Sequence, residues 1–225
     1  MRSTARSGPD GDAGATDTPQ VDRFALTPRV VHAVVGVLMM ICLVTASFLY
    51  IGSLALLVGH RHVVELIHVW SGIAMPVPLL IGLVAGTYRD DLRRLNRFRP
   101  SDWAWLRSRS RRDGQIRVGK FNAGQKLNAC LSAGSIGVLL GTGIVMYVPD
   151  AFALSWRSGA TFAHDWFALA VGFLVLGHLT FALGDRDALR GMVTGRVPMA
   201  WARREHAAWA DEADEVDPAA GNLDG

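Results

Sequence analysis

The chain has 225 residues, of which 50% are hydrophobic, and its mean hydropathy is +0.24. These values are too apolar for an ordinary soluble domain of this size. The formal net charge of +3 reflects a local excess of Lys and Arg rather than an evenly basic composition. Composition therefore excludes an ordinary soluble domain and favours a protein of the membrane.

The chain begins with a polar leader. Residues 1–23 are rich in Gly, Asp, Ser and Thr and contain few large apolar side chains, which predicts a disordered segment. The leader also separates the first apolar run from the start of the chain, and that run is too long for a signal peptide.

Four long apolar runs follow, at about residues 30–51, 63–87, 122–148 and 161–183. Each has about 20 residues or more, which is enough to cross a hydrocarbon core about 30 Å thick. Lipid cannot satisfy backbone polar groups, so each run is predicted to be a helix. We therefore expect an all-α protein, an integral membrane four-helix bundle formed by residues 24–184.

The end of the chain is polar again. Residues 185–210 mix Arg with Trp201 and Trp209, which predicts a basic segment that is cytoplasmic or lies along the membrane interface. An ordinary solvated flank of the last span explains this composition equally well. Residues 211–225 are acidic and are predicted to be a disordered tail.

The basic residues fix the expected orientation. Between Arg89 and Lys120 there are 11 Lys or Arg residues against four Asp. A basic patch can indicate nucleic acid, but this one lies between two membrane spans, and the positive-inside rule accounts for it. The other two connections carry only Arg61 and Arg157. We therefore expect a cell-membrane protein with both termini cytoplasmic and no nucleic-acid partner.

Four of the seven histidines lie within the predicted spans: His32, His68, His164 and His178. The orientation places His32 and His178 toward the cytoplasm, and His68 and His164 toward the outside. His164 and His178 are 14 residues apart, which puts them on one helix face about 21 Å apart. Two imidazole pairs at two depths suit two bis-histidine b-type haems in the bundle core. The remaining histidines, His60, His62 and His206, are expected to be solvated or interfacial.

Other interpretations of the four histidines stay open. They could form hydrogen bonds between helices, or the chain could be a non-redox membrane anchor or a metal carrier. A metal carrier would be expected to have Asp or Glu co-ligands in the middle of the spans, and the sequence has none there. Gly36 and Gly72 each follow a proposed ligand by four residues and leave room for a porphyrin, although close helix packing also uses glycine.

The segment GKFNAGQKL, residues 119–127, precedes the third span. Asn122 and Gln125 have the spacing of a capping box, and Lys126 is expected to extend toward the cytoplasmic surface. The same carboxamides can both donate and accept hydrogen bonds, which suits a ligand that alternates between quinone and quinol. The residues alone leave the structural and the quinone-binding interpretations open.

These motifs together resemble one family. RVVHAVVGVLM, ELIHVWSGIAM, KFNAGQKL and AHDWFALAVGFLVLGH are similar to segments of the gamma subunit of respiratory formate dehydrogenase, a di-haem, quinone-reactive membrane cytochrome b. The resemblance covers roughly residues 24–210. The long leader and the short GSLALLVGHRH connection at residues 52–62 depart from the family pattern.

The resemblance implies the following roles. His68 and His164 would hold the iron of an outer haem, and His32 and His178 that of an inner one. Menaquinone or another quinone would bind at Asn122, Gly124 and Gln125. Electrons would come from an iron–sulfur subunit that is fed by a molybdenum- or tungsten-containing catalytic subunit. The chain would then not act on formate by itself. Related cytochromes b serve hydrogenases and sulfur-compound reductases, so the identity of the catalytic subunit stays open.

Overall fold

The computed structural model describes residues 19–109 and 115–216. Within these ranges the chain is almost entirely helical, and four helical segments are long and apolar enough to cross a membrane. They are α1 (Leu26–Tyr50), α3 with α4 (Arg61–Ala74 and Pro76–Gly82), α7 (Ala123–Tyr147) and α8 (Leu154–Gly184). Only 6% to 11% of the residues in their most apolar windows are buried, so most of the apolar surface is left for lipid to cover.

The boundaries of the spans differ from those expected. The second span ends at Gly82 instead of residue 87, and Pro76 separates α3 from α4 because a proline cannot donate the helical hydrogen bond. Tyr88 of α5 (Gly86–Asn96) packs so closely on Gly82 that a Cβ there would lie 2.9 Å from its ring. α8 begins at Leu154 instead of residue 161, because its first turns include Ser and Arg and hydropathy does not register them as part of a span.

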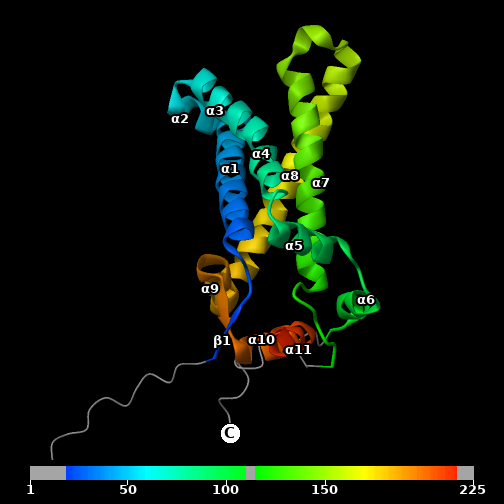
Figure 1. The fold of residues 1–225 in the computed structure, drawn as a ribbon. Helices are drawn as coiled ribbons and strands as arrows, with labels where there is room; N and C mark the ends of the chain where they lie inside the picture. Colours follow the sequence, from blue (N-terminus) through cyan, green and yellow to red (C-terminus); the bar gives the residue numbers. More distant parts are fainter. Residues whose placement is uncertain (1–18, 110–114, 217–225) are drawn as a thin grey trace, which may run out of the picture.

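The spans pack as two hairpins, α1 against α3 and α7 against α8 (Figure 1). The hairpins meet in the middle of the bundle, where a buried cluster joins all four spans through Met39, Met75, Ile136 and Val171. At one end of the bundle lie α2 (Gly52–Val58) and the short 3-10 helix Pro149–Ala151. We call this end the far end.

The opposite end, here the basic end, holds the other elements of the described chain: α5, α6 (Pro100–Arg107), α9 (Arg186–Thr194), α10 (Met199–Glu205) and α11 (Ala207–Val216) (Figure 1). Strand β1 (Gln20–Asp22) pairs antiparallel with β2 (Arg196–Pro198), with Val21 opposite Val197. A second buried cluster fills this end, formed by Val197, Met199, Trp201, Ala202, Trp209 and Ala210.

This packing corrects the expected disordered segments. The last residues of the leader 1–23 are ordered, because β1 pairs with β2 and Arg23 is buried. The first residues of the tail 211–225 are ordered as well, because α11 continues to Val216 from the buried Trp209 and Ala210. Residues 1–18 and 217–225 lie outside the described ranges. The segment 185–210 is not a solvated flank, because it supplies all six buried residues of the second cluster.

Candidate cofactor site

The four histidines of the spans meet in two pairs. His32 of α1 faces His178 of α8, with ring centroids 5.9 Å apart at an interplanar angle of 61°. His68 of α3 faces His164 of α8, with centroids 6.2 Å apart at 67°. We call these the basic pair and the far pair, after the nearer end of the bundle. The structure thus brings together the residues that charge and depth paired in the sequence.

The buried cluster in the middle of the bundle separates the two pairs. Val171 is 2% exposed and lies midway along α8, seven residues from His164 and seven from His178. Met39 and Met75 stand seven residues after His32 and His68 on their own helices. Tight packing between the two levels therefore makes them two separate sites.

The far pair is held by threonine hydroxyls. The Thr45 hydroxyl donates to the Ile41 carbonyl at 2.7 Å, so its oxygen is free to accept from His68 Nδ1, 3.0 Å away. The Cys42 carbonyl, which can only accept, lies 3.2 Å from the same Nδ1. His68 Nδ1 must therefore carry the hydrogen, and Nε2 keeps its lone pair.

His164 is held in the same way. The Thr142 hydroxyl donates to the Val138 carbonyl at 2.7 Å and lies 3.0 Å from His164 Nδ1. Metal-ligating histidines commonly donate their second ring N–H to such a partner, which fixes the tautomer and the orientation of the ring. Both imidazoles of the far pair are thus prepared to bind a metal through Nε2.

The separation of the paired rings is compatible with a haem iron between them. A metal–imidazole bond is about 2 Å long, so two imidazoles on opposite sides of one iron place their centroids about 6 Å apart. The observed separations of 5.9 and 6.2 Å match this value. A Cβ added at Gly36 or Gly72 would meet no atom within 4 Å, so there is open space one turn beyond His32 and His68.

The histidine pairs do not form an ordinary metal site made of side chains alone. Within residues 19–109 and 115–216, no group of three or more His, Cys, Asp or Glu side chains is placed to hold a metal ion. Two imidazoles fill only part of the coordination shell of an iron, and the nitrogens of a porphyrin fill the rest.

The segment before α7 forms the expected capping box. Asn122 Oδ1 accepts from the Gln125 backbone N–H at 2.9 Å, and Gln125 Oε1 accepts from the Asn122 N–H at 3.0 Å. Both carboxamide oxygens are therefore engaged. The two NH2 groups have no hydrogen-bond partner among the described residues, which leaves donors at this position.

Trp105 of α6 lies over this segment. A Cβ added at Gly124 would come within 3.1 Å of the Trp105 ring, so the indole and the α7 backbone approach closely only because residue 124 is glycine. Trp105 was not predicted from the sequence. Its position just before α7, in a basic segment, resembles any interfacial tryptophan, and no spacing rule links it to Gly124.

Lys126 does not extend to the surface as expected. It is 6% exposed, and its Nζ donates to Asp102 Oδ2 at 2.6 Å and to the Arg97 carbonyl at 2.9 Å. A lysine reaches the surface when no carboxylate is nearer, and here α6 places Asp102 directly beside it. The segment that opens α7 is therefore tied to α6 by a buried ion pair.

His206 also differs from expectation, because it is buried rather than solvated, at 2% exposure. Arg23 Nη2 donates to His206 Nε2 at 3.0 Å, and His206 Nδ1 donates to the Gly119 carbonyl at 2.7 Å. Burial, together with the positive charge of Arg23, lowers the pKa of His206 to about 3. This neutral histidine joins the N-terminal strand, the C-terminal helices and the approach to α7.

A second buried ion pair supports the same approach. Lys120 Nζ donates to Asp91 Oδ1 at 2.5 Å, between the loop before α7 and α5. Burial lowers the pKa of Lys120 and raises the pKa of Asp91, and their mutual hydrogen bond opposes both shifts. Three buried polar contacts, made by residues 119, 120 and 126, thus position the start of α7.

Comparison with known proteins places these features in a family. Residues 23–195 match the family described as prokaryotic cytochrome b561, and this stretch contains all four paired histidines and the segment before α7. The nitrate-inducible formate dehydrogenase cytochrome b556(Fdn) subunit of Escherichia coli is 28% identical over 103 residues, which are 44% of this chain and 48% of that protein.

Two further relatives carry similar names. The formate dehydrogenase cytochrome b556(fdo) subunit of Escherichia coli is 29% identical over 98 residues, which are 42% of this chain and 46% of that subunit. The formate dehydrogenase cytochrome b556 subunit of Haemophilus influenzae is 31% identical over 97 residues, or 42% of this chain and 41% of that subunit. The chain thus spans less than half the length of each relative that it matches.

Proposed function

Because the chain belongs to the prokaryotic cytochrome b561 family, we propose that it is the membrane cytochrome b subunit of a respiratory oxidoreductase complex. In this proposal two b-type haems link an electron donor at the far end to quinone at the basic end. The observation that carries it is that two histidine pairs lie at two levels along α8. The ring centroids within each pair are 5.9 and 6.2 Å apart.

The residues of the chain have distinct tasks at the two levels. His68 and His164 would hold one haem iron, and His32 and His178 the other. When bound, each haem supplies a centre that accepts and releases one electron. Thr45 and Thr142 keep the far imidazoles in the tautomer whose Nε2 can bind iron. The buried cluster around Val171 keeps water out of the region between the two levels.

The basic end would face the cytoplasm of a bacterial cell. The described Lys and Arg residues between Arg89 and Lys120 lie at this end, as does each end of the described chain. The positive-inside rule then places both termini on the cytoplasmic side of the cell membrane. Protons consumed when quinone is reduced would come from that side, so turnover would contribute to a proton-motive force.

Quinone, menaquinone or another, would bind where α7 begins. The unpaired NH2 groups of Asn122 and Gln125 can donate to quinone carbonyl oxygens, and Gly124 between them lets the Trp105 ring approach. Trp105 would border the site, because its ring already lies against residue 124. The three buried polar contacts behind the segment would keep these donors in place.

The electron donor would be an iron–sulfur subunit fed by a molybdenum- or tungsten-containing catalytic subunit. The three relatives described above are named as formate dehydrogenase subunits, which makes formate the first substrate to test for the whole complex. The chain itself would supply electron transfer and quinone reduction, with formate chemistry left to the partner.

The first test is the haem content of the purified full chain. We expect a reduced b-type absorbance spectrum and about two haems per chain. A correctly folded protein with no haem would contradict the proposal and would favour a non-redox anchor or metal carrier.

The second test addresses the quinone site. Gln125→Ala should weaken the binding of a quinol analogue while both haems are retained, because it removes a donor and not a ligand. Gln115→Ala, in the loop before α7, is the matched control. Unchanged binding in the Gln125 variant, or labelling of the far end by a photoreactive analogue, would show that the quinone site lies elsewhere.

A further inference from the structure

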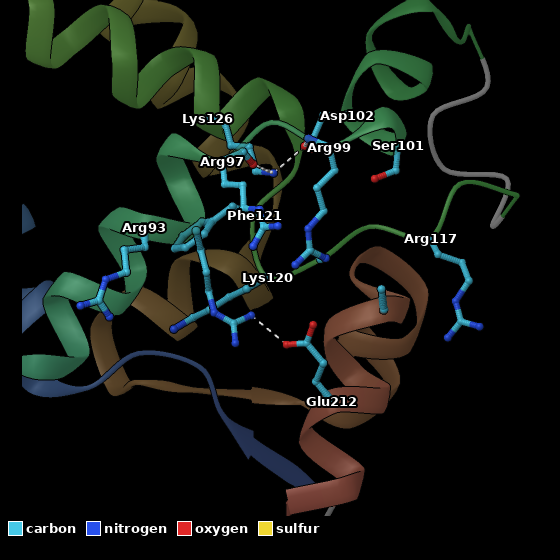
Figure 2. A pocket seen from close by; sticks show the side chains of 13 residues that line it. Arg93, Arg97, Arg99, Ser101, Asp102, Arg117, Lys120, Phe121, Lys126 and Glu212 are labelled. Carbon is cyan, nitrogen blue, oxygen red and sulfur yellow. Dashed lines mark hydrogen bonds and ion pairs between the residues drawn. The ribbon is translucent and has the colours of Figure 1, made fainter.

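A cavity of about 230 Å³ lies at the basic end, between α5, α6, the loop before α7 and α11 (Figure 2). Seven of its lining residues are Lys or Arg, and only two, Asp102 and Glu212, carry a carboxylate. We call it the arginine pocket. Six of these cations come from the basic stretch Arg89–Lys120 and the seventh is Lys126, and the fold gathers them around one cavity.

Most of these cations already have partners. The two lysines are paired, Lys120 with Asp91 and Lys126 with Asp102, in side chains no more than 14% exposed. Three of the arginines also form ion pairs: Arg93 with Asp90, Arg94 with Glu212 and Arg117 with Asp211. These pairs account for five of the seven positive charges.

Two arginines remain. Arg97 and Arg99 line the cavity, and neither guanidinium forms an ion pair within the described part of the chain. In Figure 2 the side chain of Arg99 points into the space that Glu212 enters from α11. The pocket thus holds two positive charges that no described side chain pairs, and both arginines are exposed, so an incoming anion can reach them.

The chemistry of these groups selects the ligand. Guanidinium groups bind phosphate and carboxylate through paired N–H donors, and a phosphate can meet two of them at once with separate oxygens. A phosphate monoester carries about −1.5 to −2 charges at pH 7, which balances two arginines. We propose that the arginine pocket binds a phosphate group, carried by an anionic phospholipid or by a soluble phosphate compound.

The position of the pocket is compatible with either a lipid headgroup or a soluble phosphate compound. Lys126, in the first turn of α7, lines it, so the cavity lies level with the end of a membrane span, where headgroups are found. It is also lined by Ala208 and Glu212 of α11, on the side away from the spans. The proposal concerns only these residues and does not depend on haem or quinone.

The test compares two double variants of the full chain, purified with its haems. Arg97→Gln/Arg99→Gln removes the unpaired charges of the pocket. Arg186→Gln/Arg190→Gln removes the same charge from exposed positions on α9 and is the matched control. Inorganic phosphate and then pyrophosphate are titrated by calorimetry in neutral detergent at constant ionic strength. In a second arm, phosphatidylglycerol retained from mixed phosphatidylcholine bilayers is counted by native mass spectrometry.

Saturable phosphate or pyrophosphate binding that weakens about tenfold or more in the pocket variant, and not in the control, supports a soluble ligand. Retention of phosphatidylglycerol that only the pocket variant loses supports a lipid headgroup. Absence of both, or equal losses in the two double variants, overturns the proposal. If the double variant does not fold, as judged by its helical circular dichroism, Arg99→Gln alone takes its place.

Discussion

The far and basic histidine pairs have similar ring separations but different surroundings. In the far pair, each imidazole is held through Nδ1 by a threonine one helix away. In the basic pair, the rings of His32 and His178 are exposed, and no hydrogen bond to either ring is found within the described ranges. Buried polar contacts appear instead beyond this pair, among α5, α6, α10 and the start of α7.

The difference indicates two ways of preparing a cofactor site. The far site is oriented by side chains of the spans themselves, so its geometry depends on helix packing. The basic pair lies beside a packed polar domain, so access to it depends on that domain. Mutations in the spans and in the domain should therefore affect different sites.

Loss of an axial ligand should have the largest effect. His68→Ala should lower the haem content from about two to about one per chain and leave the other haem intact. His32→Ala should remove the haem proposed at the basic pair and leave the one at the far pair. The haem-to-protein ratio and the reduced spectrum measure both effects, with the exposed His62→Ala as the control. Loss of the same spectral component in both variants would contradict the pairing.

The buried ion pair at α7 should dominate the stability of the basic end. Asp102→Asn leaves the Lys126 charge buried without its partner, which should cost about 3–5 kcal/mol of unfolding free energy. Asp90→Asn breaks the exposed pair with Arg93 and should cost about 0–1 kcal/mol. Chemical denaturation in detergent compares them, and equal costs would show that the Lys126 pair is solvated.

The threonines should affect the far site alone. Thr45→Val and Thr142→Val remove the partners of His68 and His164 and should weaken haem binding at that site about 10- to 100-fold. The affinity for haem at the basic pair should be unchanged. Titration of the apoprotein with haem gives the two affinities. Thr180→Val is the control, because the Thr180 hydroxyl bonds only to its own helix. A loss at both sites would point to a general packing defect.

Acid should destabilise the basic end modestly. His206 has a pKa of about 3 when folded, against 6.5 as the reference value. Between these values the unfolded chain binds a proton that the folded chain does not. The contribution of His206 to the free energy of unfolding is therefore complete above pH 6.5 and falls by about 1.4 kcal/mol for each pH unit below it.

This pH dependence can be measured through the tryptophans beside His206. Melting followed by fluorescence between pH 7.5 and 5.5 should show the decline in the native chain and a shallower one in His206→Gln. Trp201 and Trp209 lie 5.1 and 6.4 Å from the His206 ring, so they report on its surroundings. Identical slopes would mean that another group titrates.

The sequence by itself predicted the number and approximate positions of the spans and which histidines face each other. Hydropathy, loop charge and helical periodicity are local properties of the sequence. In a bilayer they predict the depth of each residue and the direction of each helix. The capping box at Asn122 was also visible, because its two partners are three residues apart.

Only the tertiary structure decided which polar groups are buried. Lys126 meets Asp102 across 24 residues of chain, and His206 meets Arg23 across 183. The threonines that hold the far pair lie on neighbouring helices, 22 and 23 residues from their histidines. A charged or polar side chain is buried when a partner satisfies it there, and such partners come from packing that no local pattern records.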